Sequence, residues 1–283
     1  MPYQTIDVKP IAGALGAEIH GPDLSKPLDN QTFSEIHQAF LDHQVIFFRD
    51  QDLTPDQYMA FGSRFGAPTR YPFSTGMPGY PELFEIRKEP EEKRNFGGGW
   101  HSDGTYLETP PLGTMLYAKE TPTHGGDTQW ASGYAAYEAL SEGMKKFLDG
   151  LIGINSAELK KSGGRENRGK MYQNMALSNL DEAGKIVAEH PLVRTHPGTG
   201  RKALYLNQAH TVCIKGWTEE ESKPIIDWLC AHFVRPEFTC RFQWRPGSIA
   251  LWDNRCTQHF AINDYQGQRR VMHRITMGPE RPV

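Results

Sequence analysis

The sequence has few cysteines, and their spacing is typical neither of a disulfide framework nor of a zinc finger. Cys213, Cys230, Cys240 and Cys256 include no Cys-x-x-Cys pair in a chain of 283 residues. Reduced thiols of this kind are usual in proteins that stay in the cytoplasm, which is the location we expect.

An excess of charge of one sign and long apolar runs are also missing. The 31 basic and 34 acidic side chains give a net charge of -3, so we expect no nucleic-acid partner. Apolar runs such as Val45–Phe48 are too short to cross a bilayer. The start of the chain, Met1–Thr5, lacks the charged and then apolar pattern of an export signal, so we also expect no membrane association.

The composition that remains is that of a globular protein, with 38% hydrophobic and 23% charged residues. No internal repeat or low-complexity linker interrupts it. We therefore predict one domain over residues 1–283.

Local patterns predict helices and a larger number of strands. Helix starts are indicated at Asp29 or Asn30, at Thr54-Pro55 with an end at Gly66, and at the Thr218/Glu221 capping box. Alternating or continuous apolar runs predict strands, and these lie at residues 45–48, 83–86, 114–118, 238–244, 249–252 and 269–277. Because strands and helices do not alternate regularly, we predict a mainly β fold: an antiparallel double sheet with flanking helices. The charged, glycine-containing stretch Gly163–Lys185 is interpreted as a long loop or mobile lid.

Three residues far apart in the chain could hold a metal ion. His101 and Asp103 are two positions apart, so an extended backbone points both side chains to the same face. His259 follows a predicted core strand and a turn at Asp253-Asn254, where a ligand would be well supported. Two histidines and one carboxylate form the facial triad of non-haem iron(II) oxygenases, which leaves positions open for an oxo-acid and O2. Each residue alone is more simply a structural one, and only the combination favours a metal site.

The strand after His259 carries two arginines that would share one face. Arg270 and Arg274 are four positions apart, so both point the same way in a strand. A buried guanidinium is costly without an anion, and its planar fork suits a carboxylate or sulfonate. Two such side chains next to a metal predict two anions, a cosubstrate and a substrate. A solvated edge strand is the alternative interpretation.

Four motifs together resemble the taurine dioxygenase (TauD/TfdA) family of iron(II)- and 2-oxoglutarate-dependent dioxygenases. They are Trp100-His101-Ser102-Asp103, Gly125-Gly126-Asp127-Thr128, Trp252-Asp253-Asn254-Arg255 continuing to His259, and Arg269–Arg274. The resemblance extends over nearly the whole chain and implies a jelly-roll core, the double-stranded β-helix. It also implies hydroxylation of a substrate C–H bond with O2, while 2-oxoglutarate becomes succinate and CO2. Family members commonly form oligomers, so a homodimer or homotetramer is expected.

The same resemblance implies a role for each matching residue. His101, Asp103 and His259 would bind Fe(II), and Asp103 in particular favours hydroxylation over halogenation. Arg270 and Thr128 would bind the distal carboxylate of 2-oxoglutarate. Arg274 would bind the anionic group of the prime substrate.

The substrate region departs from the pattern of the taurine enzyme. Tyr71 stands where that enzyme has histidine, and Gly97, Ala157 and His210 stand near positions of asparagine and aromatic residues. The small residues Gly97 and Ala157 should widen the pocket. Tyr71, Gly97, Asn207 and His210 are the candidate substrate-facing residues. We therefore expect taurine to be a poor substrate and a larger anion to be preferred, such as a sulfonate, a sulfate ester or an alkyl or aryloxy carboxylic acid.

Two other functions use the same residues. A zinc hydrolase could bind its metal with the same three ligands, but it leaves Thr128, Arg270 and Arg274 without a role and lacks an evident general base. A non-catalytic barrel with a retained metal site is the second alternative, and the presence of both arginines argues against it.

Overall fold

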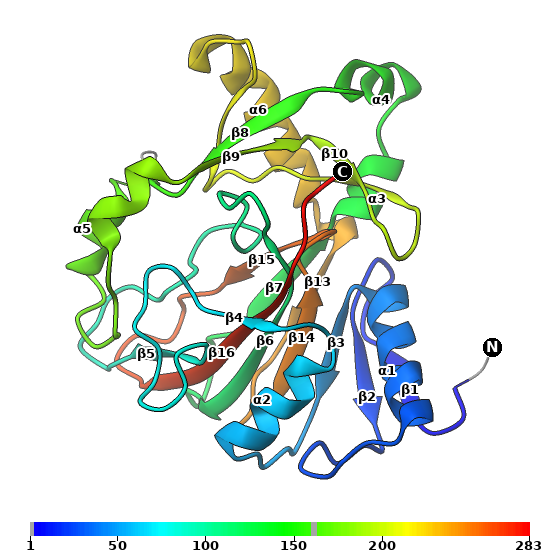
Figure 1. The fold of residues 1–283 in the computed structure, drawn as a ribbon, viewed down its shortest axis with the longest axis vertical. Coiled ribbons are helices and arrows are strands. Elements are labelled where there is room, and N and C mark those ends of the chain that lie inside the picture. The colour runs from blue at the N-terminus through cyan, green and yellow to red at the C-terminus, as the bar shows by residue number, and fades with distance from the viewer. Residues whose placement is uncertain (1–2, 160–162) are drawn as a thin grey trace.

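A large sheet of eight strands lies at the centre of the computed structural model, which describes residues 3–159 and 163–283 (Figure 1). Its neighbouring strands are antiparallel, except that β2 and β3 are parallel. The order is β1 (Asp7–Pro10), β2 (Ala17–His20), β3 (Val45–Phe48), β14 (Ile249–Asp253), β6 (Pro111–Glu120), β16 (Arg270–Pro279) and β4 (Pro68–Thr69), and β5 (Phe84–Lys88) also pairs with β16.

A smaller antiparallel sheet faces the large one across an aromatic layer. It has the order β13 (Thr239–Phe242), β7 (Thr128–Ser132) and β15 (Thr257–Ala261). Phe47 of the large sheet stacks on Phe242 of the small sheet, with ring centroids 4.0 Å apart. Trp130 and Trp252 meet edge to face at 5.7 Å. Side chains from both sheets thus share one buried core, as in packed double sheets.

The apolar run of β3 is explained by burial on both of its faces. Val45 and Phe47 point toward the small sheet. Ile46 and Phe48 belong to a separate core beneath the helices α1 (Asn30–His43) and α2 (Pro55–Ser63). A strand covered on both sides needs apolar residues at successive positions, so it shows no alternation.

The capping patterns place the helix starts correctly. The Asp29 side chain accepts a hydrogen bond from the amide of Thr32, and Thr54 forms a capping box at the start of α2. Thr218 forms a second capping box at α6 (Glu219–Phe233), which ends before Pro236. The predicted end of α2 at Gly66 is wrong by three residues, because α2 already ends at Ser63.

The remaining elements form a second region beside the two sheets. Here α6 packs with the short helix α3 (Gly133–Glu138) and with leucines of neighbouring strands. The further elements are α4 (Glu142–Leu148), η3 (Pro236–Phe238), a sheet of β12 (Thr211–Ile214), β8 (Ile152–Ser156) and β9 (Val187–Pro191), and the pair β10 (Val193–Thr195) and β11 (Lys202–Leu204). The fold is therefore mixed in its helix and strand content. Of the mainly β prediction, the antiparallel sheets and the outer helices are confirmed.

The stretch Gly163–Lys185 is more ordered than a long loop. It contains the helix α5 (Arg165–Gly169) and the 3-10 helix η2 (Leu180–Lys185). Tyr172 and Met175 are buried against Phe84 of β5, which ties the stretch to the large sheet. No helix within the described residues is both long and apolar enough to cross a membrane.

Candidate active site

A short backbone pairing brings His101 next to His259. The amide of each donates to the carbonyl of the other, at 3.1 and 2.8 Å. The two imidazole rings lie with their centroids 4.1 Å apart. His259 belongs to β15 of the small sheet, and this pairing joins it to the segment that carries Asp103.

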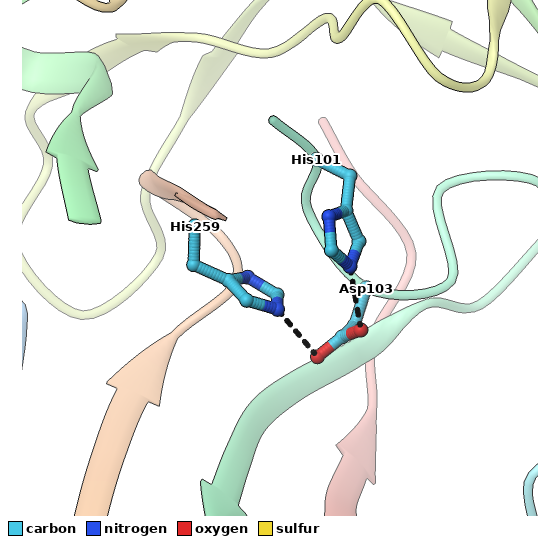
Figure 2. Close-up of side chains that lie close together, drawn as sticks. All are labelled: His101, Asp103 and His259. Atoms are coloured by element: carbon cyan, nitrogen blue, oxygen red, sulfur yellow. Dashed lines mark ion pairs between the residues drawn. The ribbon is translucent and has the colours of Figure 1, made fainter. Parts of the chain in front are cut away.

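The three side chains converge on one point (Figure 2). Nε2 of His101 is 3.7 Å from Oδ1 of Asp103, and Nε2 of His259 is 4.0 Å from Oδ2. These separations exceed hydrogen-bond lengths. They suit ligand atoms that share a cation, because atoms each about 2.1 Å from one ion lie roughly 3–4 Å apart. We call His101, Asp103 and His259 the metal triad.

Hydrogen bonds and burial around the metal triad keep its ligand atoms in states that can bind a cation. Nδ1 of His101 lies 2.7 Å from the carbonyl of Gly99, and donation to that oxygen leaves a lone pair on Nε2. Burial lowers the pKa of His259 well below its ordinary value, so this imidazole is neutral and can donate a lone pair to a metal. The hydroxyl of Thr114 donates to Asp103 at 2.7 Å and fixes the carboxylate. The donor set fits a divalent transition metal with open coordination positions.

Arg274 reaches the same carboxylate from β16. Its Nη2 lies 2.6 Å from Oδ1 of Asp103, and both side chains are buried. Burial alone would raise the pKa of Asp103, but the charge of Arg274, the two neighbouring histidines and the hydrogen bond from Thr114 together outweigh burial and hold this pKa below its ordinary range. Asp103 is therefore ionised and available as a metal ligand.

An inner cavity joins the metal triad to Arg270 and Thr128. Arg270 is 4% exposed, yet its Nε and Nη2 atoms have no hydrogen-bond partner among the described residues. The Thr128 oxygen accepts a hydrogen bond of 2.9 Å from the indole of Trp244, which leaves the Thr128 hydroxyl hydrogen free to donate. A buried guanidinium without an anion is costly, so this cavity is suited to bind a carboxylate.

A second, outer cavity shares His101, Asp103 and Arg274 with the inner one. Tyr71, Gly97 and His210 line it together with Arg274, as expected for substrate-facing residues. Burial, followed by the charge of Arg165, lowers the pKa of His210 to about 3, so its imidazole is neutral.

Asn207 is not among the residues that line this cavity. Its side chain accepts a hydrogen bond from the amide of His210 and donates one to the hydroxyl of Thr105. Asn207 therefore lies behind the wall and supports His210.

The outer cavity has further lining residues that the sequence patterns did not indicate. Most are aromatic or leucine side chains, and several come from the stretch Gly163–Lys185: Phe96, Tyr106, Leu159, Arg165, Tyr172, Leu177 and Leu180. Ala157, which was expected to widen the pocket, does not line it; Nε of Arg165 donates to the Ala157 carbonyl at 2.7 Å. The apolar residues of Gly163–Lys185 were the available signal that this stretch covers a site.

Comparisons with known proteins agree with this geometry. Residues 7–276 match the family model described as Taurine catabolism dioxygenase TauD, TfdA family. The chain is 36% identical to an alkylsulfatase of Acinetobacter baylyi, with 99% of this chain and 87% of the relative covered. It is also 36% identical to an alpha-ketoglutarate-dependent sulfate ester dioxygenase of Pseudomonas putida, with 98% and 91% covered.

Solved structures extend the match to the fold. A taurine dioxygenase from Burkholderia xenovorans superposes with a TM-score of 0.83 at 37% identity, over 99% of this chain and 93% of that one. This similarity implies a double-stranded β-helix core for the two facing sheets. With a family match over most of its length, the chain belongs to the TauD/TfdA family and is a 2-oxoglutarate-dependent dioxygenase.

Proposed function

We propose that this enzyme uses Fe(II), 2-oxoglutarate and O2 to hydroxylate a C–H bond of a small anionic organic molecule, with succinate and CO2 as co-products. The observation that carries the proposal is the position of the metal triad between two cavities. A buried guanidinium lines each cavity: Arg270 lines the inner one, and Arg274 lines both.

The metal triad would hold Fe(II). Two imidazoles and one carboxylate on one side of an ion leave the remaining positions open for a bidentate oxo-acid and O2. When bound, iron supplies the redox chemistry that couples decarboxylation of 2-oxoglutarate to hydroxylation.

The protein's own side chains then position the two organic molecules. Arg270 would pair with the distal carboxylate of 2-oxoglutarate, and the Thr128 hydroxyl would donate to the same group. Arg274 would bind the anionic group of the prime substrate and so hold a C–H bond beside the metal. The aromatic and leucine side chains of the outer cavity would exclude water around the reacting carbon.

A sulfate ester or a sulfonate is the substrate class that we favour, with alkyl and aryloxy carboxylates as related possibilities. An alkyl or aryl body suits the aromatic and leucine wall of the outer cavity, and an anionic head suits Arg274. The two relatives named for alkyl sulfates and sulfate esters support the same class.

We also propose that residues 1–283 form a single domain and that the protein is a homodimer or homotetramer in solution. Limited proteolysis tests the first and light scattering the second.

The test is coupled turnover by protein loaded with Fe(II) under anaerobic conditions. Oxygen is then added with 2-oxoglutarate and a panel of alkyl sulfates, alkanesulfonates and aryloxy acids. We expect one mole of succinate for each mole of hydroxylated or cleaved product. Cleavage that needs zinc but neither O2 nor 2-oxoglutarate would instead identify a hydrolase. The absence of oxygen consumption with every acid would indicate a binding protein.

A further inference from the structure

The outer cavity contains a second buried cation, Arg165, at the start of α5. This side chain is only 7% exposed and lines the cavity together with Arg274. Within the part of the chain that the structure describes, no carboxylate forms an ion pair with Arg165. Arg274 differs in this respect, because Asp103 lies 2.6 Å from it.

The groups around Arg165 are polar or aromatic but carry no negative charge. Its Nε donates to the Ala157 carbonyl at 2.7 Å, and its Nη1 donates to the Tyr71 hydroxyl at 2.8 Å. Its guanidinium carbon lies 4.0 Å from the centre of the Phe73 ring. Nη2 has no hydrogen bond among the described residues. A buried cation that meets only neutral groups favours the arrival of an anion.

Tyr71 places the two guanidiniums at different parts of the cavity. Arg165 binds the hydroxyl end of the Tyr71 ring, while the guanidinium carbon of Arg274 lies 5.3 Å from the ring centre. Among the described residues, Asp103 is the one carboxylate that lines the cavity, and it already faces Arg274 and the metal position. A ligand whose head group lies at Arg274 therefore extends into a region of positive potential.

We propose that Arg165 is a specificity-determining residue that selects the charge at the far end of the prime substrate. It rejects a positively charged group there and favours an anionic or hydrogen-bond-accepting one. The inference rests on the proposed function, because it places the anionic head of the substrate at Arg274. It also explains physically why taurine, with an ammonium group opposite its sulfonate, should be a poor substrate.

Three sulfonates of similar length test the proposal with the wild-type protein: taurine, propane-1-sulfonate and 3-sulfopropanoate. Their far ends are cationic, neutral and anionic. Succinate formation should give kcat/KM values that rise in this order, by roughly 10- to 100-fold from taurine to 3-sulfopropanoate, as expected for a charge several ångströms away in a partly screened site. Equal values for all three compounds would overturn the proposal.

Variants then assign the selection to Arg165. Arg165→Gln should lower the ratio of kcat/KM for 3-sulfopropanoate over taurine by about 10-fold or more toward unity. Arg165→Lys keeps the charge and should keep most of the preference. Arg281→Gln, a change at an exposed arginine, should have no effect. Equal losses for both compounds in a folded Arg165→Gln protein would show a structural role and contradict the proposal.

Calorimetric binding of the three compounds separates this inference from the proposed function. If binding follows the predicted order but no succinate is formed, the proposed function fails and the selection by Arg165 stands. If succinate is formed from several anions without any order of charge, the function stands and the inference fails. If Arg165→Gln does not fold, the order of calorimetric affinities of the wild-type protein for the three sulfonates tests the proposal, and equal affinities contradict it.

Discussion

Two clusters of potential metal ligands among the described residues each contain histidine and aspartate, but they differ in how many of their atoms are already hydrogen-bonded. The metal triad is one of them. The second cluster consists of His196, Asp253 and Cys256, whose potential ligand atoms also lie within 4.8 Å of one another.

Hydrogen bonds occupy nearly every polar atom of the second cluster. Nε2 of His196 lies 2.9 Å from Asp253, and its Nδ1 accepts the amides of Gly198 and Thr199. Both oxygens of Asp253 accept from the guanidinium of Arg255. With these lone pairs in use, the cluster has nothing left for a cation, and it serves to hold the turn between β14 and β15.

In the metal triad, the facing nitrogen and oxygen atoms are not hydrogen-bonded to one another. Its nitrogen-to-oxygen separations are too long for hydrogen bonds, and it borders both cavities. Two nitrogens of Arg270, beside the triad, lack partners among residues 3–159 and 163–283. Ligand-type residues thus indicate a binding site where their polar atoms remain unsatisfied, and a structural network where they do not.

The largest expected effect is loss of turnover when the metal triad is broken. His259→Ala should reduce succinate formation to background, because two ligands hold the metal poorly. Mn(II), added as a redox-inactive substitute, should raise the melting temperature of the wild type by several degrees through binding to the folded state, and should not do so for this variant. His124→Ala, at an exposed histidine, is the control. A normal Mn(II) shift in His259→Ala would contradict the assignment.

Damage to the second cluster should affect stability while leaving the metal stoichiometry unchanged. Asp253→Asn removes the anion between Arg255 and His196, which we expect to cost about 3–5 kcal/mol of unfolding free energy. Urea unfolding measures this loss, and metal content should remain one per chain in the fraction that is folded. Asp149→Asn, at an exposed aspartate, should stay within about 0.5 kcal/mol of wild type. If Asp253→Asn lost its metal and kept its stability, the second cluster would be a metal site and not a structural network.

Removal of the Arg270 guanidinium from the inner cavity should mainly affect the KM for 2-oxoglutarate. Arg270→Leu should raise the KM for 2-oxoglutarate by roughly 100-fold, since truncating one partner of a buried charge pair costs about 2–5 kcal/mol. The KM for the prime substrate should change far less. Arg281→Leu provides the matched control. A change confined to the prime substrate would mean that the roles of the two arginines are exchanged.

The smallest effect concerns His210, a neutral side chain in the wall of the outer cavity. Its pKa of about 3 in the fold lies below the ordinary value of 6.5, so its contribution to stability is complete above pH 6.5 and falls as the pH drops toward 3. His210→Gln should remove this part of the acid sensitivity, which amounts to about 1 kcal/mol at one pH unit below 6.5. Urea unfolding at pH 7.5 and 5.5 measures the difference, with His124→Gln as the control. An identical pH dependence in wild type and His210→Gln would show that His210 is not kept neutral by burial.

Local patterns in the sequence were sufficient for the elements that carry the site. The capping residues Asp29, Thr54 and Thr218 locate three helix starts, because a cap depends on neighbours only three residues away. The spacing of Arg270 and Arg274 places both on one face of β16, because a strand alternates its faces regardless of the fold around it. The resemblance of four motifs to one family then links these elements to a reaction.

Other features depended on packing between distant segments. The pairing of His101 with His259 joins two parts of the chain whose separation in sequence carries no spatial information. Arg165, Tyr172 and Leu180 line the outer cavity only because Gly163–Lys185 folds over Asp103 and Arg274, and its charged composition resembles that of a surface loop. Residue types and their spacing are enough to show which side chains could bind a metal and two anions. Which of those side chains keep unsatisfied atoms beside a cavity depends on folding, since hydrogen-bond saturation and burial arise from all the segments that meet there.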